Sequence, residues 1–149
     1  MGSNPTLSAR NFAEQNLLGA YSLWLLADRQ MKFRFKNFTV YQDAKVFCKT
    51  CREVVNSGIE QQDRDLAGQI DRALNSIVLN IAEGSADNSD SEFSRFLSIS
   101  IRSVYEVVAG FDLALLYGML SEETNEKVEA EAHELVKKLS AFRNTLKKK

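Results

Sequence analysis

The stretch SIVLNIAEGSADNSDSEF, from Ser76 to Phe93, decides the fold because its character changes halfway along. Aliphatic residues, interrupted only by Asn80, run up to Glu83 and Gly84, and short polar residues fill most positions from there to Phe93. Such a change is typical of a helix that ends at a glycine, followed by a tight turn and a second helix. The same composition could also form a loop that binds a metal ion or a phosphate.

Known ligand loops do not match this stretch. A calcium loop that started at Asp87 would need a glycine at its sixth position and a glutamate at its twelfth, where the chain has Glu92 and Ser98. A Walker phosphate loop would need a lysine after the glycine pattern, which is missing. Ser89 and Glu92 instead match the S-x-x-E capping box of a helix start. The stretch is therefore interpreted as a turn between two helices.

On both sides of this turn, apolar residues recur at the spacing of amphipathic helices. The predicted helices run from Thr39, with a Thr39–Gln42 capping box, to Gly58; from Asp63 to Glu83, with Gly84 as the stop; from Asp90 to Tyr117, with Gly118 as the stop; and from Ser121 onward. Their predicted core faces are Val40, Ala44, Phe47, Cys48, Cys51, Val54 and Val55; Leu66, Ile70, Leu74, Ile77 and Ile81; Phe93, Phe96, Leu97, Val104, Val108, Phe111 and Leu115; and Val128, Ala132, Leu135, Leu139, Phe142 and Leu146. Long helices joined by short turns predict an all-α fold, an up-down-up-down antiparallel four-helix bundle.

The 149 residues are expected to form one bundle domain over residues 31–149 with an N-terminal helical extension over residues 1–30. The opening MGSN is typical of an expression-tag remnant, so the extension is either vector-derived or an added docking helix. The longest apolar run, Leu17 to Ala27, is shorter than the ~20 residues that span a bilayer. A cytoplasmic protein is expected, because the two cysteines suggest no disulfide framework.

No set of residues predicts catalysis, a metal or a cofactor. Cys48 and Cys51 form a C-x-x-C pair, but zinc needs four ligands and both sulfurs fall on the predicted apolar face, where cysteine packs as a small hydrophobe. The single histidine, His133, lies among glutamates and is interpreted as a solvated surface residue. The chain is therefore not expected to be an enzyme.

Basic residues gather in two segments although the formal charge of the chain is only -1. Six lie between Met31 and Arg52, and the last 13 residues hold six more and no acid. In an up-down-up-down bundle these segments should converge at one end, which could then contact phosphates. The residues predicted to bind nucleic acid are Lys32, Arg34, Lys36, Lys45, Lys49, Arg52, Arg143, Lys147 and Lys148. The alternative, that lysines match the dipole of the last helix, does not explain the basic residues that precede the first helix.

Polar residues also recur along one side of the second and third helices. Two interpretations stay open: solvated faces, or faces that meet each other or another subunit. The residues predicted to make such oligomer or polar contacts are Arg72, Ser76, Asn80, Glu83, Arg95 and Arg102.

Three segments together resemble a known family: FRFKNFTVYQDA (33–44), QIDRALNSIVLNIAEGS (69–85) and EFSRFLSISIRSVYEV (92–107). They are similar to the four-helix-bundle proteins encoded in intervening sequences of bacterial 23S ribosomal RNA genes. That family is related to the accessory variability determinant (Avd) proteins of diversity-generating retroelements. The likeness covers most of residues 33–146.

The resemblance implies a bundle without enzymatic activity that assembles into a homopentamer. For the Avd branch it implies an accessory subunit that binds a reverse transcriptase and nucleic acid. We therefore expect a homo-oligomer that binds RNA or DNA and a reverse transcriptase. The alternative is a structural or protein-binding oligomer with no direct nucleic-acid role.

Overall fold

The structure is a computed structural model that describes residues 33–86 and 89–146. In these residues all regular secondary structure is helical, which confirms the predicted all-α class. The predicted extension over residues 1–30 and its boundary at residue 31 lie outside the described residues.

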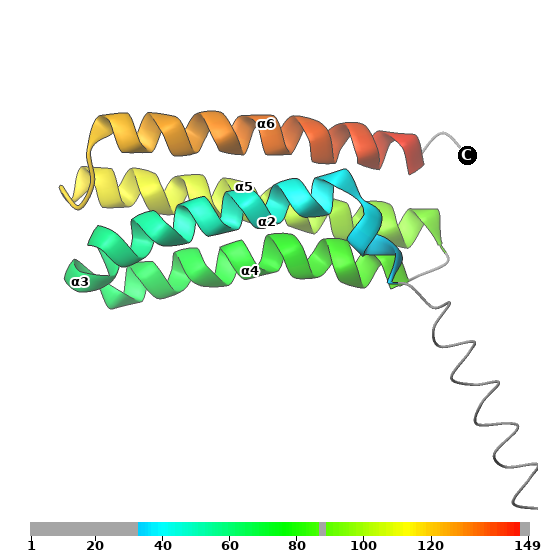
Figure 1. The fold of residues 1–149 in the computed structure, drawn as a ribbon, viewed down its shortest axis with the longest axis horizontal. Helices are drawn as coiled ribbons and strands as arrows, with labels where there is room; N and C mark the ends of the chain where they lie inside the picture. The colour runs from blue at the N-terminus through cyan, green and yellow to red at the C-terminus, as the bar shows by residue number, and fades with distance from the viewer. Residues whose placement is uncertain (1–32, 87–88, 147–149) are drawn as a thin grey trace, which may run out of the picture. The chain divides into compact units, whose positions relative to one another are not determined.

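Long helices make up most of the described chain (Figure 1). They are α2 (Thr39–Val54), α4 (Arg64–Ala86), α5 (Asp90–Leu116) and α6 (Glu122–Leu146). Three short segments accompany them: the 3-10 helix η1 (Arg34–Asn37), the π-helix η2 (Val55–Ile59) and α3 (Glu60–Gln62). Across the described ranges, none of the helices combines the length and the apolar character needed to span a membrane.

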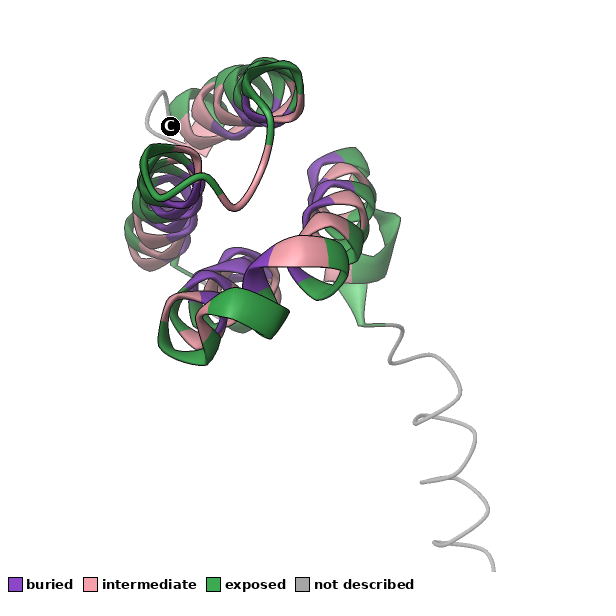
Figure 2. Cartoon of the chain, turned by 90° about the vertical axis from the view of Figure 1, so that its left-hand side faces the viewer, coloured by how far each residue is buried: buried purple, intermediate pink, exposed green. Residues whose placement is uncertain are grey.

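Helices that are neighbours in the chain lie side by side with opposite directions (Figures 1 and 2). Between α2 and α4, Cys48 bonds to Leu74 and Arg52 bonds to Asp71, so rising numbers on one helix pair with falling numbers on the other. Bonds between α4 and α5, and between α5 and α6, show the same reversed order. Helix α2 also lies beside α6, which closes the arrangement around a shared interior.

The sides of the helices that face this interior are buried (Figure 2). Most predicted core residues lie there: Val40, Ala44, Phe47, Cys51, Val55, Ile70, Leu74, Ile77, Ile81, Phe93, Leu97, Val104, Phe111, Val128, Ala132, Leu135 and Leu139. The others are only half-buried: Cys48, Val54, Leu66, Phe96, Val108, Leu115, Phe142 and Leu146. Burial of aliphatic and aromatic side chains is the main force that holds the helices together.

The first helix starts at Thr39 as predicted, but the predicted Thr39–Gln42 capping box is wrong. Thr39 is already helical, and Phe38 occupies the N-cap with extended backbone angles (φ -79°, ψ 126°) and no side-chain cap. The side-chain amide of Gln42 donates instead to the carbonyl oxygen of Lys36 at 2.7 Å. Phe38 is held at the boundary because its ring packs edge-on against Phe142, 5.2 Å between centroids.

The predicted end of this helix at Gly58 is also wrong. The chain continues in helical form through η2 and α3 to Gln62, and the Asp63 side chain then caps α4 by accepting two backbone N–H groups. Val55 and Ile59, four residues apart in the π-helix, are both fully buried. Continued burial of these two side chains explains why the glycine does not end the helix.

Gly84, predicted as the stop of the second helix, is a buried residue inside α4, which continues to Ala86. A Cβ atom at Gly84 would lie 2.6 Å from Cβ of Phe96 on α5. Gly110 of α5 faces α4 in the same way, since a Cβ atom there would lie 2.6 Å from Cγ1 of Ile70 on α4. These glycines therefore permit a close approach of α4 and α5.

Both predicted boundaries of α5 are confirmed. Ser89 is the N-cap of α5, and its hydroxyl accepts the backbone N–H of Glu92 at 3.3 Å. After α5, Gly118 has a positive φ of 74°, and Met119 N donates to the carbonyl of Ala114 at 2.9 Å. This is the Schellman arrangement, in which a glycine satisfies the last helix carbonyls.

Candidate nucleic-acid interface

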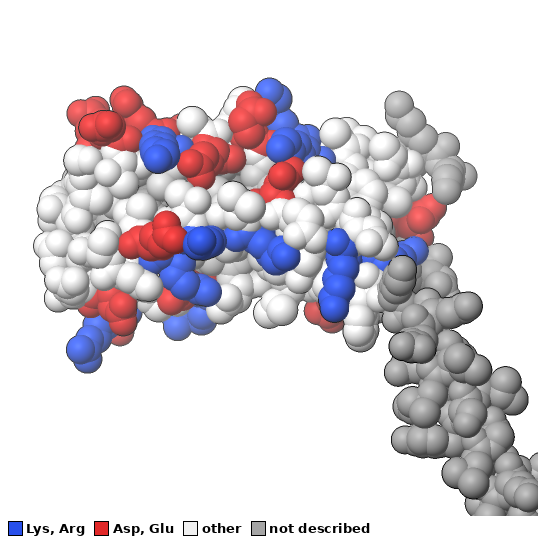
Figure 3. Space-filling view, viewed as in Figure 1, with Lys and Arg blue, Asp and Glu red and all other residues white. Residues whose placement is uncertain are grey.

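A groove of about 510 Å³ runs between α2 and α4. Three predicted nucleic-acid residues, Lys45, Lys49 and Arg52, line it from α2. They recur at steps of four and three, which places them along one side of the helix. Figure 3 shows basic side chains in a line across the middle of this face of the molecule. The other lining residues are Cys48, Glu53, Asn56, Leu74, Asn75 and Val78.

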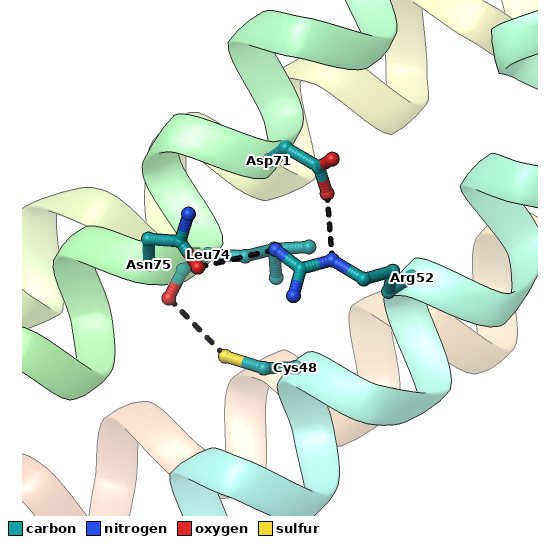
Figure 4. Close-up of polar contacts among 5 residues, drawn as sticks. All are labelled: Cys48, Arg52, Asp71, Leu74 and Asn75. Carbon is teal, nitrogen blue, oxygen red and sulfur yellow. Dashed lines mark hydrogen bonds and ion pairs between the residues drawn. The ribbon is translucent and has the colours of Figure 1, made fainter.

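Arg52 is fixed across the groove by two residues of α4 (Figure 4). Its Nε donates to Asp71 Oδ1 at 3.0 Å, and Nη2 donates to Asn75 Oδ1 at 3.1 Å. Both charged side chains keep about two fifths of their surface exposed. The guanidinium therefore has a defined position and still faces solvent. Asp71 and Asn75 were not predicted, because their spacing of four shows only that they share one side of α4 and not that Arg52 lies opposite.

Cys48 lies at the base of the groove, where its Sγ donates to the carbonyl oxygen of Leu74 at 3.2 Å (Figure 4). Burial raises the pKa of the Cys48 thiol to about 11, and the nearby Arg52 charge lowers it only in part. Cys51 is fully buried in the core, and burial raises its pKa further. Both thiols are thus protonated at neutral pH. Over residues 33–86 and 89–146, His, Cys, Asp and Glu form no group of three that could hold a metal ion.

The two lysines of the groove are exposed. Lys45 Nζ lies 5.3 Å from the centre of the Tyr41 ring, in a cation–π contact. Lys49 Nζ is 3.9 Å from Glu53 Oε1, and its side chain is 80% exposed, so this ion pair is weak. The lysine charges are therefore accessible to an anion that enters from solvent.

The prediction that Lys45, Lys49 and Arg52 gather at one end of the bundle is wrong. These three residues form a row along the axis of α2. A helix rises ~1.5 Å per residue, which places Arg52 about 20 Å along the axis from Thr39. Other predicted residues contact the protein itself: Arg34 Nε donates to the Ser85 carbonyl, and Arg143 Nη1 donates to Ser98 at 3.1 Å. The backbone carbonyl of Lys36 accepts a bond from Gln42. Lys32, Lys147 and Lys148 lie outside the described residues.

Arg143 differs from a surface cation in a further respect. Its Nε atom is buried and has no hydrogen-bond partner among the described residues. Arg143 of α6 is therefore partly buried and hydrogen-bonded to Ser98 of α5, so it connects these two helices.

The predicted polar stripe on α4 meets α5 at one point. Ser76 Oγ accepts a hydrogen bond from Ser103 at 2.8 Å and another from Asn80 Nδ2 at 3.0 Å. Arg72 bonds to Gln69 of its own helix, and Glu83 is exposed. Ser103 was missed in the prediction because a buried serine has no apolar periodicity to mark it.

The predicted polar residues of α5 lie elsewhere. Arg95 bonds to Glu92 at 2.9 Å and stacks over Phe96, 4.5 Å from the ring centre. Arg102 is exposed. Ser98 accepts the bond from Arg143 of α6. The predicted polar residues of α5 therefore do not contact the polar stripe of α4, which Ser103 contacts instead.

Comparison with known proteins places the fold in a described group. Residues 36–141 match the family model described as 23S rRNA-intervening sequence protein. A crystal structure of a protein of unknown function from the S23 ribosomal protein family of Bacteroides thetaiotaomicron has a similar fold, with a TM-score of 0.63 and 21% sequence identity. The similarity covers 70% of this chain and 98% of that chain. Among curated protein sequences, none matches this chain.

Proposed function

Because the chain belongs to the 23S rRNA-intervening sequence protein family, we propose that it is a non-catalytic accessory protein that binds nucleic acid as a homo-oligomer. The proposed binding surface is the groove between α2 and α4. Its partner by resemblance to the Avd branch is a reverse transcriptase, and its oligomer by the same resemblance is a pentamer.

One observation carries this proposal: Lys45, Lys49 and Arg52 line a single groove and all reach solvent. The row covers eight residues of α2, a rise of about 10 Å at ~1.5 Å per residue, enough for two phosphate groups. Each phosphate that a cation neutralises releases a condensed counterion, so a short row on a nearly neutral protein can still bind a polyanion.

The homo-oligomer part of the proposal assigns the α4 stripe to subunit contacts. Arg72, Asn80 and Glu83 offer charged and amide groups on one side of α4, and Asn80 is already oriented by Ser76. Arg95 and Arg102 are exposed on a different side of α5 and would form a separate subunit contact.

A second candidate function is protein binding without nucleic acid. Large apolar side chains are exposed on α4 and α5: Leu79, Tyr105, Leu113 and Leu116 are between 42% and 75% exposed, as is Tyr117 just after α5. Tyr105, Leu113 and Leu116 lie within about three turns of α5, and apolar side chains exposed close together favour contacts with other proteins.

Fluorescence anisotropy with a labelled RNA, measured over a salt series, tests the first candidate. The double variant Lys45→Glu, Lys49→Glu should weaken binding at least about tenfold at low salt and reduce the slope of log K against log salt by ~0.7 per lost phosphate contact. The matched control Lys127→Glu, Lys137→Glu changes the net charge equally on exposed positions of α6 and should bind almost as the unaltered protein does.

Equal weakening in both double variants would attribute binding to net charge alone and contradict the groove. If the unaltered protein does not bind RNA or DNA at low salt, the second candidate function takes precedence.

A further inference from the structure

An aromatic residue, Tyr41, lies on α2 one turn before Lys45, next to the residues that line the groove. Tyr41, Lys45, Cys48 and Arg52 follow one another at steps of four, three and four on α2, so they lie along the side that faces α4. Tyr41 is half-buried, and its ring meets the Phe35 ring edge-on with 4.8 Å between centroids. This contact fixes the plane of the tyrosine ring.

The opposite wall of the groove is of mixed character. Leu74 and Val78 of α4 supply apolar surface, and Asn75 supplies an amide beside the guanidinium of Arg52. The groove therefore combines a rim of cations, which also holds Glu53, with an apolar wall that carries one amide, and the Tyr41 ring lies beyond one end. Single-stranded nucleic acid is bound by this combination, because its bases are free to stack while its phosphates meet cations.

The dimensions of the groove favour a single strand over a duplex. The groove on the surface between α2 and α4 has a volume of about 510 Å³, which is too small to enclose a double helix. In a duplex the bases are stacked inside, where Tyr41 cannot reach them, and recognition is limited to the outer phosphates and groove edges. From Tyr41 to Arg52 the row spans about 17 Å at ~1.5 Å per residue, the reach of a few nucleotides.

We propose that the groove between α2 and α4 binds single-stranded RNA or DNA, with a base stacked on Tyr41 and the neighbouring phosphates on Lys45 and Lys49. Arg52, held by Asp71 and Asn75, receives the far end of the bound segment. Lys45 leaves its position over the Tyr41 ring when the base takes that place. This inference rests on the proposed function, since it names the class of nucleic acid for the same groove.

Competition among three probes of equal length and label tests this inference with the whole chain: a single-stranded RNA, a single-stranded DNA and an RNA duplex. Both single strands should bind at least about tenfold more tightly than the duplex. A difference between the RNA and DNA strands would identify a contact with the 2′-hydroxyl.

Three variants separate the stacking role of Tyr41 from its structural role. Tyr41→Leu keeps an apolar side chain against Phe35 but removes the ring, and it should weaken single-strand binding about five- to hundredfold with duplex binding unchanged. Tyr41→Phe keeps the ring and should bind as the unaltered protein does. Tyr105→Ala removes an exposed tyrosine on α5 and should have no effect.

Ultraviolet crosslinking of the unaltered protein to a strand that carries 5-iodouridine, followed by mass spectrometry, gives a readout independent of any variant. We expect the adduct on Tyr41. If duplex and single strand bind equally, and the adduct lies elsewhere, the single-strand inference is overturned while binding by the groove stands. If the lysine variants also leave binding unchanged, both are wrong.

Discussion

Two glycines of the same helix have different surroundings, which gives them different roles. At Gly84 a Cβ atom would lie 2.6 Å from Phe96 Cβ and 2.8 Å from the Phe93 ring. At Gly68 it would lie 3.5 Å from the end of the flexible Arg72 side chain, an ordinary contact. Only Gly84 is needed for the packing of α5 on α4.

Gly84→Ala should therefore destabilise the protein. Overpacking costs about 1–3 kcal/mol, because Phe96 Cβ is fixed to the backbone and cannot move aside, while the gain in helix propensity is only ~1 kcal/mol. Thermal unfolding followed by circular dichroism measures the change. The control Gly68→Ala gains the propensity without the clash and should melt higher; a higher melting temperature for both variants would contradict the close contact.

The two cysteines should be unreactive in the folded protein. Burial raises the pKa of Cys48 to about 11 and that of Cys51 further, so hardly any thiolate forms near pH 8. Alkylation by iodoacetamide at pH 8 should be much slower in the native protein than after unfolding in guanidinium chloride. Native thiols that react as fast as unfolded ones would refute the burial.

The same pKa shift links stability to pH. In the unfolded chain these thiols ionise near their ordinary pKa of ~8.5, whereas in the fold Cys48 stays protonated up to about pH 11. The unfolded state therefore binds fewer protons in this window, and the free energy of unfolding falls as pH rises through it. Melting curves from pH 7 to 10 should show a steeper loss for the unaltered protein than for Cys48→Ala.

At the scale of elements, the sequence predicts an end correctly where the signal is local. Ser89 and Gly118 act through bonds to residues within five positions, so their spacing alone identifies a cap and a stop. Gly58 and Gly84 do not end their helices, because contacts with other helices outweigh the local signal. Near Gly58, the burial of Val55 and Ile59 in the core keeps the chain helical through η2. Gly84 lies inside α4, where it lets Phe96 of α5 come close.

The candidate site follows the same rule. Lys45, Lys49 and Arg52 could be predicted as a group because they share one helix and one charge. Their bonds to α4 could not, since nothing in the spacing on α2 indicates that Asp71 and Asn75 lie opposite Arg52. The sequence therefore predicts the types of residue in the groove and not the groove itself.

At the scale of the whole molecule, the proposed homo-oligomer has a direct test. In Asn80→Ala, Glu83→Ala the polar surface of α4 loses an oriented amide and an exposed carboxylate, while the core contacts of the helix remain. Size-exclusion chromatography with light scattering should show a smaller assembly. Normal assembly by this variant, or equal dissociation of the α6 control Lys127→Ala, would count against the α4 stripe as a subunit contact.

Helix α2 has its core residues and its exposed lysines on different sides. Ala44, Phe47 and Cys51 fill the core, while Lys45 and Lys49 project into solvent. A substitution at either lysine would change the charge of the groove and leave the packed interior as it was. Across generations, the charge on this side of α2 can therefore change with little penalty in folding, so relatives that share this bundle are free to differ in it.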